Sequence, residues 1–191
     1  MYKLVLALLL VTSPLFAGQH SDYQLRPLVH WQIPNNEGRG IAGWTIFPDI
    51  TQPFRTVIVA GWLMKDGQNW LEIMSGGVFT ASTRTPLINV RAYNRNKRTD
   101  LYTEFQIRPN LTLASVFVTS PLQIKNFVFR SGFEFEAVTG LNGNIKNQAL
   151  VGPRISFTVP KIAWLSVATV AYTDLRGHLI MRNYIVATIR H

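Results

Sequence analysis

Formal charges occur at alternate positions of several apolar segments, and these are the first residues in the chain that could do chemistry. In "NFVFRSGFEFEAVTG", residues 126–140, Arg130, Glu134 and Glu136 share one parity and the phenylalanines occupy the other. Successive side chains of a β-strand point to opposite faces, so the segment predicts a strand with one charged and one apolar face. The same division elsewhere extends the charged set to Glu72, Arg91, Glu104, Arg108, Arg130, Glu134, Glu136, Arg154 and Arg182, with Arg190 near the end of the chain.

Two functions are open for this charged set if it lines the lumen of a barrel. With Arg190 it contains six arginines and four glutamates, which would make a selectivity lining that favours anions. The alternative is a paired network that plugs the lumen, because charges removed from bulk water need partners. A narrow barrel favours the plug.

Catalytic chemistry has weaker candidates. Glu134 and Glu136 could act as the acid and base of a glycosidase, but glutamates on the same face ordinarily pair with neighbours such as Arg154 or Arg108. His178 lies near Asp174 at a predicted turn, as in barrel enzymes that modify lipids, but no serine is close in sequence. We therefore predict that the protein is not an enzyme.

Metal and nucleic-acid sites are not predicted either. Histidines 20, 30, 178 and 191 are scattered and cysteine is absent, so no metal or other cofactor is expected. The basic stretch "RAYNRNKR", residues 91–98, could bind phosphates, but a solvated hairpin tip among lipid headgroups explains it more simply. The expected partners are anionic, namely lipid headgroups, lipopolysaccharide or small anionic solutes, and no nucleic acid is expected.

The first seventeen residues, "MYKLVLALLLVTSPLFA", have the layout of a secretory signal peptide. An early lysine precedes an apolar run that is too short to span a bilayer as a helix, and Ala17 provides a small residue for cleavage. We assign residues 1–17 to a signal peptide, 18–40 to an N-terminal extension and 41–191 to a β-barrel. The formal net charge of +9 favours anionic partners, and the 15% of charged residues is low for a soluble domain, where about a quarter is usual.

The chain after residue 40 predicts about ten strands that position the charges. Turn residues separate them, and no gap is long enough for a crossover helix, so neighbouring strands should pair antiparallel in an up-and-down meander. Trp164 and Tyr172 share a parity eight residues apart, a spacing suited to aromatic residues at the two membrane interfaces. The expected strands cover residues 41–47, 55–64, 70–79, 87–94, 101–108, 111–119, 126–138, 148–159, 162–173 and 178–190.

The last residues, "NYIVATIRH", resemble the final strand of bacterial outer-membrane β-barrels. That strand typically ends at an aromatic residue with apolar residues at alternate positions before it; here Ile185, Ala187 and Ile189 fill those positions, and His191 stands at the end. The resemblance implies an all-β, antiparallel transmembrane barrel of 8–10 strands in the cell outer membrane. Its role would be a small pore or a structural membrane protein, with both chain ends in the periplasm.

A soluble periplasmic or secreted barrel is the alternative. "IAGWTIF" approaches the Gly-x-Trp signature of lipocalins, barrels that bind apolar ligands, but Ala42 replaces the glycine. "TVIVAGWLM" is apolar on both parities, which suits a strand buried on both faces.

Overall fold

The computed structural model describes residues 21–48, 55–124, 127–141, 145–159, 162 and 164–190. The expected signal peptide lies outside these residues. All regular structure in them is β-strand, and no helix among them is long and apolar enough to cross a membrane. The eleven strands are β1 (Ser21–Pro34), β2 (Arg39–Ile46), β3 (Arg55–Asp66), β4 (Asn69–Thr80), β5 (Arg84–Arg95), β6 (Asp100–Arg108), β7 (Leu111–Ile124), β8 (Phe127–Gly140), β9 (Gln148–Thr158), β10 (Leu165–Asp174) and β11 (Leu179–Arg190).

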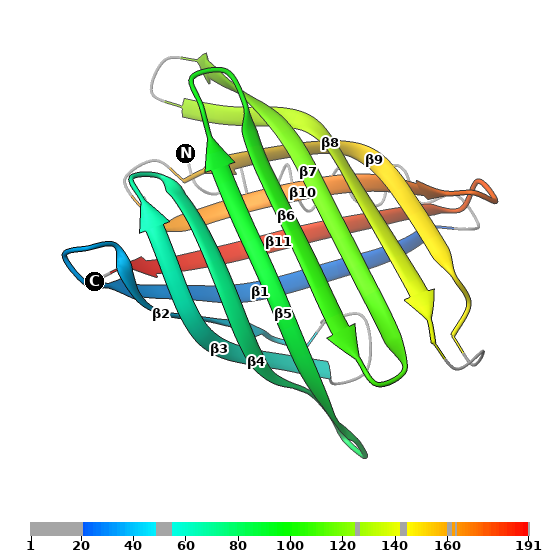
Figure 1. Ribbon diagram of the computed structural model, residues 1–191. Coiled ribbons are helices and arrows are strands. Elements are labelled where there is room, and N and C mark those ends of the chain that lie inside the picture. Colours follow the sequence, from blue (N-terminus) through cyan, green and yellow to red (C-terminus); the bar gives the residue numbers. More distant parts are fainter. Residues whose placement is uncertain are drawn as a thin grey trace.

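The strands form one closed barrel (Figure 1). Consecutive strands pair antiparallel, and the barrel is closed by β1 and β11, which run parallel with Val29 opposite Ala187. The expectation of 8–10 strands is therefore wrong, and so is the expectation of a purely antiparallel order, because β1 and β11 are parallel. With eleven strands, β1 starts at one end of the barrel and β11 finishes at the other. The expectation that both ends of the barrel sequence lie on one side of the barrel is therefore wrong.

The additional strand is β1, which lies within the expected N-terminal extension. Its even positions from Gln24 to Gln32 are mostly polar, whereas Leu25, Val29 and Ile33 alternate with them. Pro27 interrupts this pattern, so the alternation is less clear in the sequence than in the other strands. Between Leu28 and Pro34 the segment pairs antiparallel with β2, which makes it part of the barrel wall.

The two ends of the barrel carry different turns. The end at which β11 finishes, called here the C-terminal end, carries the tight turns after β1 and β3, where Gly38 and Gly67 adopt positive φ angles of 76° and 55°. The opposite N-terminal end carries the turns after β4, β6 and β10 and the longer 141–147 connection. In Figure 1 the C-terminal end lies at the upper left.

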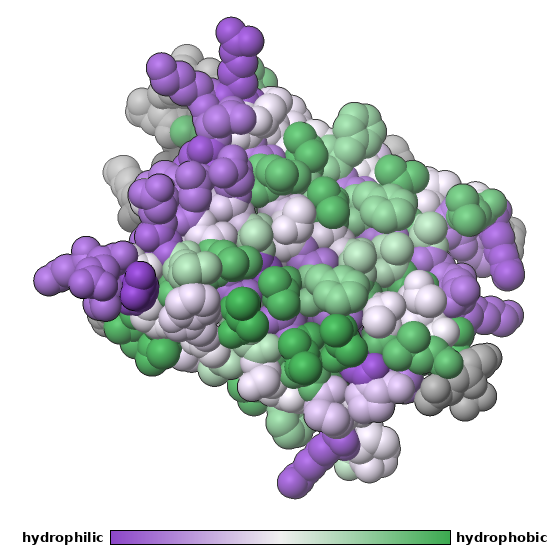
Figure 2. Space-filling model, in the orientation of Figure 1, coloured by the Kyte–Doolittle hydropathy of each residue, from purple (hydrophilic) through white to green (hydrophobic). Residues whose placement is uncertain are grey.

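Burial alternates along the strands and shows which side chains face outward. On β8, Phe133 is 67% exposed, whereas Glu134 between it and Phe135 is 4% exposed. Every strand except β10 presents at least one exposed large hydrophobic side chain. Among the outward positions of the eleven described strands, charged residues occur only at strand-terminal Arg39, Asp66 and Arg84. Figure 2 shows hydrophobic side chains gathered over the middle of the visible face, with hydrophilic ones concentrated at its left and upper left.

Hydrophobic side chains fill the interior toward the N-terminal end. One cluster contains Val57, Val59, Met74, Val78 and Leu87 with Leu28 and Trp44; the other contains Leu150, Val170, Tyr172 and Ile180. The first cluster explains why β3 is apolar on both parities. Tyr172 is fully buried in the interior, so its expected place at a membrane interface is wrong.

Candidate functional site in the barrel lumen

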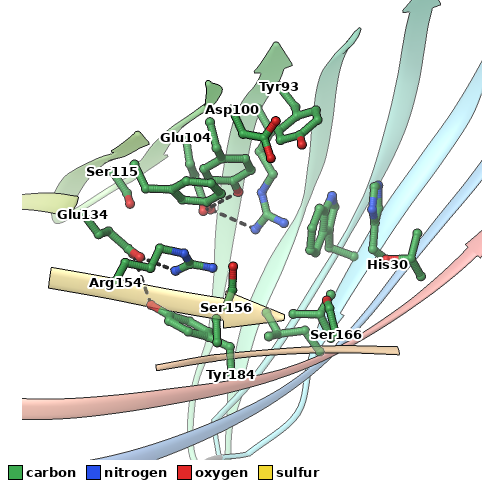
Figure 3. Close-up of a pocket in the computed structure, with 18 of the residues that line it drawn as sticks. His30, Tyr93, Asp100, Glu104, Ser115, Glu134, Arg154, Ser156, Ser166 and Tyr184 are labelled. Carbon is green, nitrogen blue, oxygen red and sulfur yellow. Dashed lines mark hydrogen bonds and ion pairs between the residues drawn. The ribbon is translucent and has the colours of Figure 1, made fainter. Parts of the chain in front are cut away.

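The C-terminal half of the lumen contains a cavity of about 700 Å³. Gln68, Arg95 and Arg190 line it near the C-terminal end, and Arg26 and Glu136 line it further inside. Figure 3 shows Arg154 and Glu134 approaching the cavity from one side and His30 from the opposite side. The lining includes six arginines and four carboxylates, so its formal charge is positive with His30 neutral.

Glu72 on β4 is fully buried and anchors one wall of the lumen. His30 Nε2 lies 2.7 Å from its Oε1, Gln32 donates to the same oxygen at 2.7 Å, and the indole N–H of Trp44 donates to Oε2 at 2.7 Å. The His30 ring stacks on Trp44 with centroids 3.9 Å apart. This carboxylate is held by three donors from β1 and β2. The hydrogen bonds connect β1, which closes the barrel with β11, to β4.

Glu104 on β6 organises the second charged group. Arg91 Nη2 donates to its Oε1 at 2.8 Å, and the hydroxyl of Tyr102 donates to Oε2 at 2.9 Å. Arg91 also lies over the Trp44 ring, 4.1 Å from the centroid. The Arg91 guanidinium therefore connects the Glu104 group to the Glu72 wall.

Aromatic rings form a continuous wall between these groups. Trp70 stacks on Tyr93 with centroids 5.8 Å apart and meets Tyr102 edge-on at 6.1 Å. Tyr102 stacks on Phe117 at 4.7 Å, and Arg154 from β9, two strands from β7, lies over Phe117 at 4.2 Å. The cavity therefore has flat apolar faces beside its charges.

Glu134 and Glu136 on β8 are both ion-paired, Glu134 to the neighbouring strand β9 and Glu136 to β11. Arg154 Nη1 and the Tyr172 hydroxyl donate to Glu134. Arg182 binds Glu136 with both terminal nitrogens, at 2.7 and 3.2 Å. The two carboxylates are thus held by separate arginines, which supports the ion-paired interpretation over the glycosidase one.

Asp100, at the start of β6, joins two arginines near the C-terminal end. Arg95 donates to its Oδ1 at 2.8 Å and Arg130 donates to its Oδ2 at 2.6 Å. Arg91 and Arg95 of the basic 91–98 stretch therefore point into the lumen, whereas Lys97 and Arg98 are exposed in the turn. A single carboxylate between two guanidiniums leaves one positive charge in excess.

The structure places all nine predicted lumen residues at inward positions and brings seven of them into ion pairs, whereas Glu72 accepts hydrogen bonds from neutral groups. Arg91 pairs with Glu104, Arg154 with Glu134 and Arg182 with Glu136; Glu72 contacts His30, and Arg130 contacts Asp100. Arg108 instead donates to neutral Gln106 at 2.8 Å, so its suggested pairing with Glu134 or Glu136 is wrong.

The sequence argument missed several lumen residues. These residues occupy inward positions that were not included in the predicted set: Arg26, His30, Gln32, Trp44, Asp100, Tyr172 and Tyr184. The signal was present in β1, where Gln24, Arg26, Leu28, His30 and Gln32 share the inward parity. At the turn after β10, Asp174 Oδ1 accepts the backbone N–H groups of Arg176 and His178 at 2.8 and 2.9 Å, which is an ordinary turn-capping role.

No three histidine, cysteine or acidic side chains in the described part of the chain are grouped so that they could hold a metal ion. Comparisons with protein-family models, curated proteins and solved structures gave no match for this chain.

Proposed function

We propose that this chain is a transmembrane β-barrel of outer-membrane type, and that its positively charged lumen forms a small pore that favours anions. The observation that carries the proposal is the inverted polarity of the barrel. Glutamates and arginines lie inside, and Phe133, Phe135 and the equivalent residues of other strands lie outside.

Lipid accounts for this polarity better than water. Soluble monomers rarely expose a continuous apolar surface of this kind, whereas a bilayer requires one. A closed barrel also pairs the backbone groups of neighbouring strands, which is a condition for crossing hydrocarbon. A lipocalin-like barrel that binds an apolar ligand would need an apolar interior, but the cavity is lined by charged pairs such as Arg91–Glu104.

Any conducting path through this lumen has to be narrow. The two hydrophobic clusters occupy its N-terminal half, and the ion pair between Arg182 on β11 and Glu136 on β8 joins strands that are not neighbours. The excess of arginine over carboxylate in the cavity lining favours anions through the field that these charges create.

Cell fractionation and gel electrophoresis test the membrane assignment. The protein should require detergent for extraction, and the folded barrel should migrate differently before and after boiling. Recovery of a folded protein in the soluble fraction without detergent would overturn the assignment and favour the soluble barrel.

Conductance in planar bilayers tests the pore. Arg91→Gln and Arg130→Gln should each lower the preference for chloride over potassium, because each removes a positive charge that lines the cavity. Arg84→Gln is the matched control, since Arg84 is exposed at an outward position at the start of β5. A barrel that conducts with unchanged ion preference in the two lumen variants would contradict anion selectivity, and a folded barrel with no conductance would contradict the pore.

A further inference from the structure

Two arginines share one carboxylate in the wall of the cavity, near the C-terminal end of the barrel. Arg95 donates to Asp100 from Nε at 2.8 Å and from Nη2 at 3.2 Å, and Arg130 donates to the same carboxylate from Nε at 2.6 Å. Arg130 is on β8 and Asp100 is on β6, so this contact reaches past β7. All three residues line the cavity. Because each guanidinium stays protonated, the group has a net charge of +1.

This group presents donors to the cavity and covers its own acceptor. Asp100 is only 1% exposed, whereas the side chains of Arg95 and Arg130 are 32% and 20% exposed. Among the described residues, Arg130 makes its hydrogen bond to Asp100 through Nε, and its two terminal nitrogens have no acceptor. A guanidinium held by Nε offers these terminal N–H groups in a fixed orientation to a further acceptor.

The other carboxylates of the cavity wall do not compete for these donors. Glu104, Glu134 and Glu136 are each held by an arginine of their own. Asp100 is the carboxylate of the described lining that two arginines share. An anion that enters the cavity therefore meets a positive charge that no side chain of this group neutralises.

The aromatic wall of the cavity begins beside this group. The Arg95 guanidinium carbon lies 5.7 Å from the centroid of the Tyr93 ring, and Tyr93 stacks on Trp70 at 5.8 Å. Figure 3 shows Tyr93 and Asp100 together on the cavity wall. The volume of about 700 Å³ is far larger than an inorganic anion needs and is in the range of sites for organic ligands. The space beside the two guanidiniums is thus suited to a flat apolar group.

We propose that the lumen binds aromatic carboxylates, with the carboxylate held by Arg130 and Arg95 and the ring placed against Tyr93 and Trp70. A carboxylate matches the planar fork of a guanidinium, and its single negative charge balances the net charge of the group. This inference rests on the proposed function in one respect, because it names the class of anion that the lumen favours.

Calorimetric titration of the detergent-folded barrel with benzoate, acetate and benzamide tests the site, after subtraction of a titration into detergent alone. Benzoate should bind about tenfold more tightly than acetate, because only benzoate gains an aromatic contact. It should also bind about tenfold more tightly than benzamide, which has the same shape and no charge. Equal affinity of benzoate and either of the other two ligands would overturn the proposal.

Two variants locate the binding groups. Arg130→Gln should weaken benzoate binding about tenfold or more and change benzamide binding much less, because a charge-assisted hydrogen bond is lost. Tyr93→Leu should reduce the advantage of benzoate over acetate. The matched controls are Arg84→Gln and Phe105→Leu, which alter outward-facing residues. Equal effects of the lumen variants and the controls would contradict the site.

Migration of each variant before and after boiling shows whether the barrel has folded. If Arg130→Gln does not fold, Arg95→Gln replaces it, because Arg130 then still holds the buried carboxylate of Asp100. A barrel that requires detergent and shifts on boiling but binds benzoate no better than benzamide would disprove this inference alone. A soluble protein would disprove the membrane assignment, whatever it binds.

Discussion

Phe133→Arg distinguishes a lipid-facing surface from a water-facing one more directly than any other substitution on the barrel. Phe133 is 67% exposed and lies in the middle of the fourteen-residue strand β8, six residues from Phe127 and seven from Gly140. At about 3.3 Å per residue it is therefore roughly 20 Å along the strand from either end. The apolar band of a membrane barrel is about 25 Å tall, so this position falls near its centre.

The expected cost follows from that depth. An arginine on the lipid face destabilises a membrane barrel by about 2–4 kcal/mol at the bilayer midplane and by about 0–1 kcal/mol near the interfaces. An exposed substitution on a soluble protein usually changes stability by less than about 0.5 kcal/mol. The two environments therefore predict clearly separated values for the same variant.

Urea unfolding of the barrel in lipid vesicles measures the difference. Thr139→Arg is the matched control, because Thr139 has the same parity on β8 and lies next to its end at Gly140. We expect Phe133→Arg to lower the unfolding free energy by at least about 2 kcal/mol and Thr139→Arg by less than about 1 kcal/mol. If neither variant changed the unfolding free energy by more than about 0.5 kcal/mol, hydrocarbon would not cover this face.

Two further predictions concern the wall and its closure. Glu72→Ala should lower the unfolding free energy by about 3 kcal/mol or more, because it leaves three buried donors without an acceptor and each unsatisfied donor costs about 1–3 kcal/mol. Glu37→Ala in an exposed turn is the control. Equal urea midpoints for the two variants would contradict a structural role for Glu72. The chain has no cysteine, so Val29→Cys with Ala187→Cys should form a disulfide across the parallel seam on oxidation. The control pair Val29→Cys with Ile185→Cys is offset by two residues and should not form a disulfide. Non-reducing gels that showed a disulfide in the control pair and none in the first pair would contradict the register of β1 and β11.

The period-two pattern made the strands predictable from sequence. All ten expected strands are present with shifts of a few residues at their ends, because alternation and turn residues act locally. The inward parity of Glu134, Glu136 and Arg154 was predictable for the same reason. The strand β1 was missed because Pro27 and the glycines after Pro34 suggested an extension.

Only one pairing of charges was predictable, that of Arg154 with Glu134 on the neighbouring strand. Arg182 reaches Glu136 across 46 residues of sequence and Arg130 reaches Asp100 across 30, so these contacts depend on how many strands separate the partners and how the barrel closes. The position of Tyr172 was not predictable either. Its membership of one face of the strand was predicted, but that face was expected to contact lipid and instead points into the lumen, where Tyr172 donates to Glu134.

The sequence by itself determined that this chain is built from strands with one polar and one apolar face, because a strand turns local alternation directly into two surfaces. Only the tertiary structure decided that β1 closes an eleven-stranded barrel in parallel with β11. It also decided that Arg182 on β11 reaches Glu136 on β8. Strand order and cross-barrel distance are set by closure of the whole sheet, which no local pattern encodes.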